Sequence, residues 1–365
     1  MFGYKHYIPI LKWRQAEQSC LADIAPLGSH IIQPATKITP LIEIPSIAWD
    51  FIKDKPAKTI DQHLSKVPEQ LFKAWGSHAN LYLDMMLIDP DETMKDGRHP
   101  LNYIFDEARL KEVKLIPVTG LNREDDYQEA VRHSISKDKR GLCLRLKDEE
   151  FEDENLEVKL QSTLKLLDIK KASEVDLVLD YADISGENLR RLGKAVLGTI
   201  SEIVKIGKWR TLTFAASSFP NNLSAIPSNS IETIPRKEWE VWRSLISSAV
   251  DRKPSFGDYA IQHPEPVEVD PRIMMMSASI RYTLDDEWLI LKAKSVKRHG
   301  FEQYHSICKA LVSDPRFYGE MFSWGDRQIA QCAREATGPG NATTWRKVGT
   351  SHHLKVVSAQ ISSLP

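Results

Sequence analysis

The sequence YIPILK at residues 7–12 is a short apolar run that ends on a lysine. Seven similar runs follow within the first 263 residues, at 39–43, 81–84, 115–119, 142–145, 176–180, 211–218 and 258–263. Helix-like stretches separate the runs, and this alternation predicts parallel strands. Because eight such units close a (β/α)8 barrel, we predict a TIM-type α/β fold. An open doubly wound sheet is the rival, but the segment after the first run, KWRQ, lacks the glycine-rich turn typical of that fold.

Amphipathic helices are predicted between the runs. Apolar residues recur at intervals of three and four in segments 153–169, 187–206 and 237–250, which is the spacing of a helix with one buried face. Gly76, Gly141 and Gly207 each follow a helical segment and precede a strand. Glycine accepts the left-handed conformation that often ends a helix, so these residues support the predicted junctions.

The character of the sequence changes after His263. Segments 274–283 and 288–295 flank the polar turn 284–287 and predict a β-hairpin. Helical segments follow at 301–312 and 325–336, and one of them could be the eighth barrel helix. We therefore predict a barrel core at residues 1–263 and a C-terminal α+β appendage at residues 264–365. His352 and His353 are adjacent, which on a strand would point them to opposite faces, so we expect surface positions.

Composition narrows the possible partners. The 49 lysines and arginines nearly balance the 50 aspartates and glutamates, so the net charge of −1 gives no general attraction to nucleic acid or acidic membranes. The four cysteines form no CxxC pair, and no apolar stretch is long enough to span a membrane. We expect a cytoplasmic protein without a membrane partner, whose free thiols stay reduced.

The appendage combines lysines with aromatic residues. Nucleic-acid contact is one interpretation, but lysines on edge strands more commonly deter aggregation, so we regard this partner as unlikely though not excluded. Trp288, Trp324 and Trp345 could either recognise a partner or pack the appendage onto the barrel. We expect packing for Trp324 and recognition for Trp345.

Five of the apolar runs end on a charged residue: Lys12, Glu43, Asp84, Arg145 and Asp180. The chemistry of a (β/α)8 barrel lies at the C-terminal ends of its strands, so these residues should converge on one rim. Our functional interpretation makes the three carboxylates catalytic acids and bases or metal ligands, with the two cations binding an anionic group. The alternative is a structural layer of salt bridges, and sequence spacing does not separate the two.

Two further residues belong to the predicted rim. Ser217 ends the seventh run, where barrel loops often bind phosphate, and His263 ends the eighth, where it could carry a proton or cap the chain. The polar loop 88–99 could fold over the mouth. The chain has no HExxH, EF-hand, GxGxxG or P-loop motif. Carboxylates from separate strands could still hold a divalent metal such as Mg²⁺.

Several segments resemble the "Beta protein" family of phages and bacteria. They are YIPILKWRQAEQSCLADI (7–24), ITPLIEIP (38–45), GLCLRL (141–146), RTLTFAASSFP (210–220), LILKAKS (289–295) and WRKVGTSHHL (345–354). The resemblance extends over nearly the whole chain. Its occurrence in phages and prokaryotes implies a role in phage–host conflict, but it assigns no reaction and no residue roles.

Together these features predict a charged pocket for a small anionic molecule, either phosphate-bearing or nucleotide-like. If the protein is an enzyme, we expect a hydrolase or lyase that uses the rim carboxylates. The alternative is a non-catalytic component of an anti-phage defence or counter-defence complex, with a protein partner.

Overall fold

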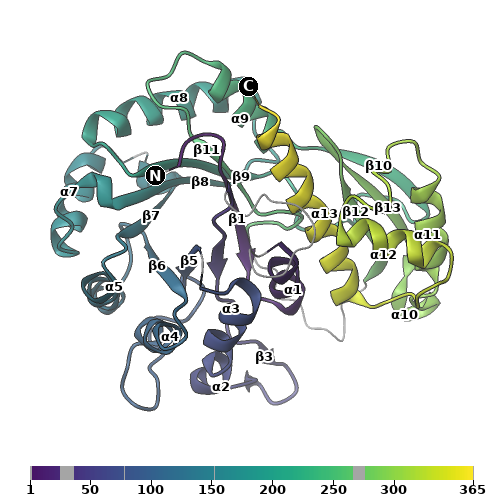
Figure 1. Cartoon of the computed structure of the whole chain (residues 1–365), viewed down its shortest axis with the longest axis horizontal. Coiled ribbons are helices and arrows are strands. Elements are labelled where there is room, and N and C mark those ends of the chain that lie inside the picture. The colour runs from purple at the N-terminus through teal and green to yellow at the C-terminus, as the bar shows by residue number, and fades with distance from the viewer. Residues whose placement is uncertain (1, 25–36, 78, 152, 266–275, 365) are drawn as a thin grey trace.

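The structure, a computed structural model, describes residues 2–24, 37–77, 79–151, 153–265 and 276–364. Eight parallel strands pair in a closed ring and confirm the predicted barrel (Figure 1). In sequence order they are β1 (Tyr7–Lys12), β2 (Leu41–Glu43), β5 (Asn80–Asp84), β6 (Lys114–Thr119), β7 (Leu142–Lys147), β8 (Val175–Asp183), β9 (Thr211–Ser217) and β11 (Ser255–Asp258). Around the ring each strand neighbours its sequence neighbours among these eight, and β11 closes onto β1.

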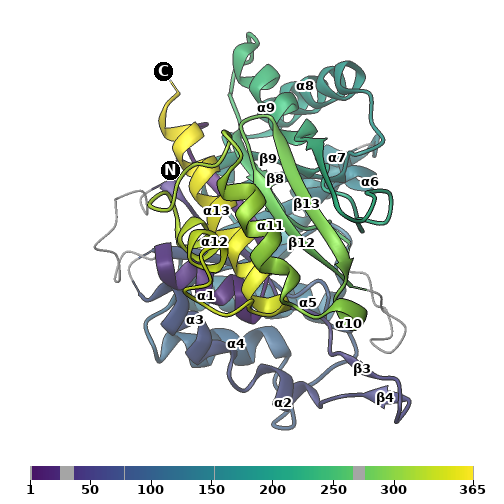
Figure 2. The same ribbon diagram turned by 90° about the vertical axis from the view of Figure 1, so that its right-hand side faces the viewer.

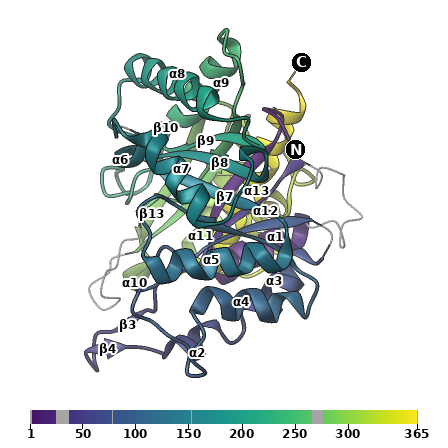
Figure 3. The ribbon, with the colours of Figure 1, turned by 90° about the vertical axis from the view of Figure 1, so that its left-hand side faces the viewer.

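Helices surround the barrel wall (Figures 1 and 3). They are α1 (Gln15–Ile24), α2 (Ile60–Leu64), α3 (Val67–Trp75), α4 (Pro100–Arg109), α5 (Asp125–Asp138), α6 (Asp148–Phe151), α7 (Leu156–Leu166), α8 (Leu189–Ile206) and α9 (Lys237–Ser247). Gly76 and Gly141 have the positive φ predicted for helix ends, but the prediction is wrong for Gly207, which ends α8 with an extended backbone. Gly141 precedes β7 with φ of +79°, and a Cβ there would lie 2.1 Å from the Glu174 carbonyl oxygen, so only glycine fits.

The eighth barrel strand lies earlier in the sequence than the predicted run at 258–263. The strand is Ser255–Asp258, and the chain turns away after Asp258 instead of beginning a strand there. Ala260 adopts a φ of 54°, and its backbone N–H donates to Asp258 Oδ1 at 3.0 Å. An aspartate that binds the backbone two residues ahead favours a turn, and this ends the strand.

The predicted hairpin is present in the appendage (Figure 2). Strand β12 (Ser277–Thr283) pairs antiparallel with β13 (Glu287–Ser295), and predicted positions 274 and 275 lie outside the described residues. A third strand, β10 (Ser230–Pro235), pairs with the other edge of β13. Sequence reasoning missed β10 because it is a short, mostly exposed edge strand within the connection between β9 and α9. A smaller hairpin, β3 (Trp49–Asp50) with β4 (Lys55–Pro56), follows β2.

The eighth barrel helix is the last helix of the chain, α13 (Ala342–Ser362), and neither of the two predicted candidates. Leu354, Val357 and Ile361 of α13 belong to the barrel core, and α13 lies against α1 (Figure 1). The candidates α11 (Gln303–Val312) and α12 (Trp324–Ala333) instead pack in the separate apolar core of the appendage, beside the short α10 (Val296–His299). Helix α11 packs against β12 and β13, and α12 packs against α11 and α13. The predicted boundary between the barrel core and the appendage, at residue 263, stays a prediction.

The expected surface position of His352 and His353 is wrong, because both lie on α13 and are fully buried. His353 Nε2 lies 2.8 Å from Asp258 Oδ2, and its Nδ1 lies 2.9 Å from Thr283 Oγ1. His352 Nδ1 lies 2.9 Å from Asp326 Oδ2. Burial is tolerated because each ring has hydrogen-bond partners at both nitrogens. The pair joins the barrel to the appendage.

The appendage tryptophans are mainly packing residues. Trp288 is fully buried, with its ring 5.1 Å from that of Phe219. The expected recognition role of Trp345 is wrong, because only 6 % of it is exposed and it stacks on Tyr304 at 4.1 Å. Trp324 is half-buried beneath the ammonium of Lys347, which lies 3.9 Å from the ring centre.

All four cysteines are free and buried. Within the described ranges, none of the helices has both the length and the apolar character needed to cross a membrane.

His353→Leu should lower the free energy of unfolding by roughly 2 to 4 kcal/mol, because it removes a donor from buried Asp258. Burial alone would raise the pKa of Asp258, but His353 and Tyr7 lower it, so the carboxylate is charged at neutral pH. Urea unfolding measures the loss. In an Asp258→Asn background the same substitution should cost less. An equal cost in both backgrounds would show that the hydrogen bond does not matter.

Candidate functional site

Aspartates bind the backbone two residues ahead in two barrel strands, β5 and β8. Asp84 Oδ1 accepts the backbone N–H of Met86 at 2.9 Å, and Asp180 Oδ1 accepts that of Ala182 at 3.0 Å. The first bond holds a turn at the end of β5, and the second lies at an irregularity in β8 between Asp180 and Asp183. The Oδ2 atom of each aspartate is left to bind a side chain inside the rim.

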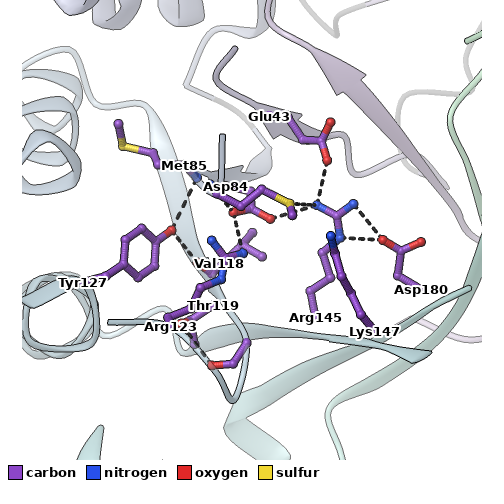
Figure 4. A network of polar contacts seen from close by, with 12 residues as sticks. Glu43, Asp84, Met85, Val118, Thr119, Arg123, Tyr127, Arg145, Lys147 and Asp180 are labelled. Atoms are coloured by element: carbon purple, nitrogen blue, oxygen red, sulfur yellow. Dashed lines mark hydrogen bonds and ion pairs between the residues drawn. The ribbon is translucent and has the colours of Figure 1, made fainter. Parts of the chain in front are cut away.

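That side chain is Arg145 on β7, which lies at the centre of the rim (Figure 4). Its Nη1 donates to Glu43 Oε1 and Asp84 Oδ2, both at 2.8 Å, and its Nε donates to Asp180 Oδ2 at 2.9 Å. Its Nη2 lies 2.7 Å from both Asp180 Oδ2 and the Tyr259 hydroxyl. We call these five residues the Arg145 layer. None is more than 3 % exposed, and Nε, Nη1 and Nη2 of Arg145 each donate a hydrogen bond within the layer.

A second guanidinium supports the layer from outside. Arg123, between β6 and α5, places Nη2 at 3.0 Å from Asp84 Oδ1 and lies over the ring of Tyr127 at 5.2 Å. Two guanidinium groups therefore face three carboxyl groups, and the ammonium of Lys12 acts on Glu43 as a further positive charge.

Glu43 is the carboxyl of the layer whose pKa is raised. Burial raises its pKa, and the negative charge of Asp84 adds to this, although Arg145 opposes both. Burial also acts to raise the pKa of Asp84, but Arg123 and Arg145 outweigh it and lower the value. Within the described part of the chain, Glu43 Oε2 has no hydrogen-bond partner. The environments of Glu43 and Asp84 therefore shift their pKa values in opposite directions.

Lys12 lies beside Glu43 in the register of β1 and β2 but does not join the layer. Its Nζ donates to the carbonyl oxygens of His263 and Pro264, at 3.1 and 2.9 Å. Burial lowers the pKa of Lys12 to about 8, while the charge of Glu43 acts to raise it and nearby arginines, Arg14 among them, act to lower it. Lys12 therefore anchors the chain after β11 in a region of surplus positive charge.

Ser217 and His263 lie outside the layer. Ser217 Oγ donates to the carbonyl of Gln262 at 3.2 Å, and His263 Nε2 lies 3.3 Å from Asp183 Oδ2. Both side chains thus have structural partners, and their substrate-binding role stays a prediction.

A cavity of about 440 Å³, which we call the mouth cavity, opens beside the layer at the ends of β5, β6 and β7. Its lining includes Arg145, Arg123, Lys147 and His99, with Tyr127 on one wall. The predicted loop 88–99 borders it, as the polar sequence suggested. Apolar parts of the wall come from Met85, Met86, Ile88, Pro90 and Pro100.

Charge in the mouth cavity is sorted by depth. The basic residues of the lining are buried or half-buried, whereas the acidic residues are mostly exposed. The exposed acids are Asp89, Asp91, Glu124, Asp125, Asp126 and Glu149. The buried acid, Glu150, is occupied by backbone N–H groups, with Leu121 at 2.6 Å and Lys147 at 2.8 Å. The cavity therefore has a cationic floor and an acidic entrance.

Sequence reasoning missed Arg123, Lys147, His99 and Tyr259. The sequence contained a pattern that could have predicted only Lys147. This residue lies two positions after Arg145 on β7, so the two side chains share a face of the strand. The others follow strands in loops or at helix starts. Among the residues that the structure describes, no group of three or more His, Cys, Asp or Glu side chains is arranged to hold a metal ion.

The fold and site define a (β/α)8 barrel protein with a buried ionic layer and a cavity at its C-terminal rim. The chain belongs to the Beta protein family, whose match covers residues 7–359 and confirms the resemblance seen in the sequence segments. No curated protein matches the sequence significantly.

Glu43→Gln should stabilise the protein relative to the wild type as pH rises. Unfolded glutamate ionises near pH 4.3, whereas folded Glu43 has a raised pKa. The wild type therefore has the full stabilisation below that pH and loses it as pH rises toward the folded pKa, by up to about 1.4 kcal/mol per pH unit. Glutamine has no proton to lose and keeps an acceptor for Arg145.

Urea unfolding at pH 5 and pH 7.5 measures the difference. Glu232→Gln on the exposed edge of β10 is the control. A Glu43→Gln effect that is the same at both pH values would mean that Glu43 is ionised in the folded protein.

Proposed function

We propose that the mouth cavity binds a small molecule that directs an anionic group to the floor and a neutral or cationic part to the entrance. The sorting of charge by depth carries this proposal. Half-buried cations stabilise a bound anion more strongly than exposed cations do, because water screens their field less. Pockets of this size and position are common ligand sites in barrels.

Lys147 and Arg123 are the residues best placed to hold the anion. In the described chain, the Lys147 ammonium has no ion pair or hydrogen bond, and Figure 4 shows its side chain running beside that of Arg145. Arg123 uses one N–H on Asp84, which leaves others for a ligand. The N–H groups of Arg145 bind the layer, so Arg145 contributes its positive charge and not a direct contact.

His99 adds a neutral donor. Its Nδ1 accepts the backbone N–H of Leu101 at 3.1 Å, so the neutral ring carries its hydrogen on Nε2. Burial lowers the pKa of His99, which favours that neutral form at pH 7. The ring can therefore donate one hydrogen bond to a ligand without adding charge.

The acidic entrance narrows the ligand class. Six exposed carboxylates would repel a polyanion such as a nucleoside triphosphate and attract an ammonium group. A zwitterion, such as an amino acid, satisfies both ends of the cavity. The proposal thus keeps the anionic group expected from the sequence but argues against a multiply charged nucleotide here.

A binding role without catalysis is the second candidate. Two observations support it. Arg145 is hydrogen-bonded to all three carboxyl groups, and Glu43 is buried, so these carboxyl groups are not exposed to a ligand as an acid–base pair. If the protein were a hydrolase or lyase, Glu43 would have to reach the ligand through a movement of the layer. A cytoplasmic role in phage–host conflict, together with a protein partner, is the biological setting that we propose from the family and composition.

Lys147→Met should weaken ligand binding at least tenfold, because a charge-assisted hydrogen bond contributes about 1.5 to 3 kcal/mol. Isothermal titration with glycine, lysine, succinate and ATP measures it, and the zwitterions should bind more tightly than ATP. Lys165→Met, on the exposed face of α7, is the matched control. Tighter binding of ATP than of any zwitterion, or equal binding by the Lys147→Met variant, would refute the proposal.

A further inference from the structure

A second cavity, of about 400 Å³, lies at the C-terminal ends of β1 and β2, where α1 and α3 lie side by side (Figure 1). We call it the β1–β2 cavity. Its described lining includes the cations of Arg14 and Lys58 and no acidic side chain. We infer that this cavity is a binding site for a phosphomonoester. It shares no lining residue with the mouth cavity.

The uncharged lining also presents donors. Gln70 Oε1 accepts Trp13 Nε1 at 3.2 Å and Gln18 Nε2 at 3.4 Å. These two bonds fix the amide and leave the Gln70 NH₂ group to donate. His63 Nε2 lies 2.8 Å from the carbonyl oxygen of Pro45, which can only accept, so that contact fixes the ring. Trp13 is 5 % exposed and holds the wall in place.

Positive charge is in excess around this end of β1. Arg14 reaches the surface, yet the surrounding protein and then the charge of Arg346 lower its pKa. Lys12, behind it, has a pKa lowered to about 8 by burial, with Arg14 and Arg346 acting in the same direction. Neighbouring cations that destabilise one another are stabilised by a bound anion, and a dianion does so most.

The donor set fits a phosphomonoester better than a carboxylate. The planar guanidinium of Arg14 can bind two oxygens of a phosphate at once, and the Lys58 ammonium adds a point charge for a third. The cavity has room for more than the phosphate group alone. Both a sugar phosphate and a nucleoside monophosphate share this chemistry.

Isothermal titration of the full chain at low ionic strength tests the inference with inorganic phosphate, glucose 6-phosphate and AMP as probes. Arg14→Met and Lys58→Met should each weaken binding at least tenfold. Lys66→Met removes an exposed charge near the cavity without altering its lining and should have no effect. Lys147→Met should also leave phosphate binding unchanged, which separates this site from the mouth cavity.

Lys58 is exposed, and within the described residues its ammonium has no hydrogen bond, so its removal does not endanger folding. Binding of either ester that both cavity variants weaken supports the site. The ester that binds more tightly then shows whether the site prefers a sugar or a nucleoside. Absence of binding to the wild type by all three probes overturns the inference. So does binding that Arg14→Met and Lys58→Met leave unchanged, or that Lys66→Met weakens equally.

Discussion

One buried guanidinium organises the C-terminal end of the barrel. Arg145 on β7 binds Glu43 from β2, Asp84 from β5 and Asp180 from β8, and it also binds Tyr259 directly after β11. Five segments are therefore tied to one side chain. A buried cation is tolerated only when its charge and all its donors are compensated, and this requirement sets the identity of the residues around it.

The two aspartates divide their oxygens between the backbone turn ahead and the arginine. Glu43, with a longer side chain, gives one oxygen to Arg145, and its other oxygen has no partner among the described residues. This difference is consistent with the raised pKa of Glu43 and the lowered pKa of Asp84. Beside the layer, Arg123 and Lys147 line the mouth cavity and present the positive charge that a ligand would meet.

The sequence was sufficient for the barrel and for the contact among Glu43, Asp84, Arg145 and Asp180, because strand alternation and parallel pairing are local patterns that place strand ends on one rim. It was insufficient for features that depend on distant packing. The burial of His353 needs Asp258, 95 residues away, and the eighth barrel helix comes after the whole appendage. The cavities are formed by loops from several strands, and no local pattern marks His99 or Arg123 as neighbours.

The central claim is that burial in the Arg145 layer raises the pKa of Glu43, whereas Arg123 and Arg145 lower that of Asp84. Carbon-13 NMR of protein labelled at the glutamate side-chain carboxyl measures this directly, with Glu43→Gln used to assign the signal. The account predicts a Glu43 signal that remains protonated when the signals of exposed glutamates have ionised. A Glu43 signal that titrates together with those exposed glutamates would contradict it.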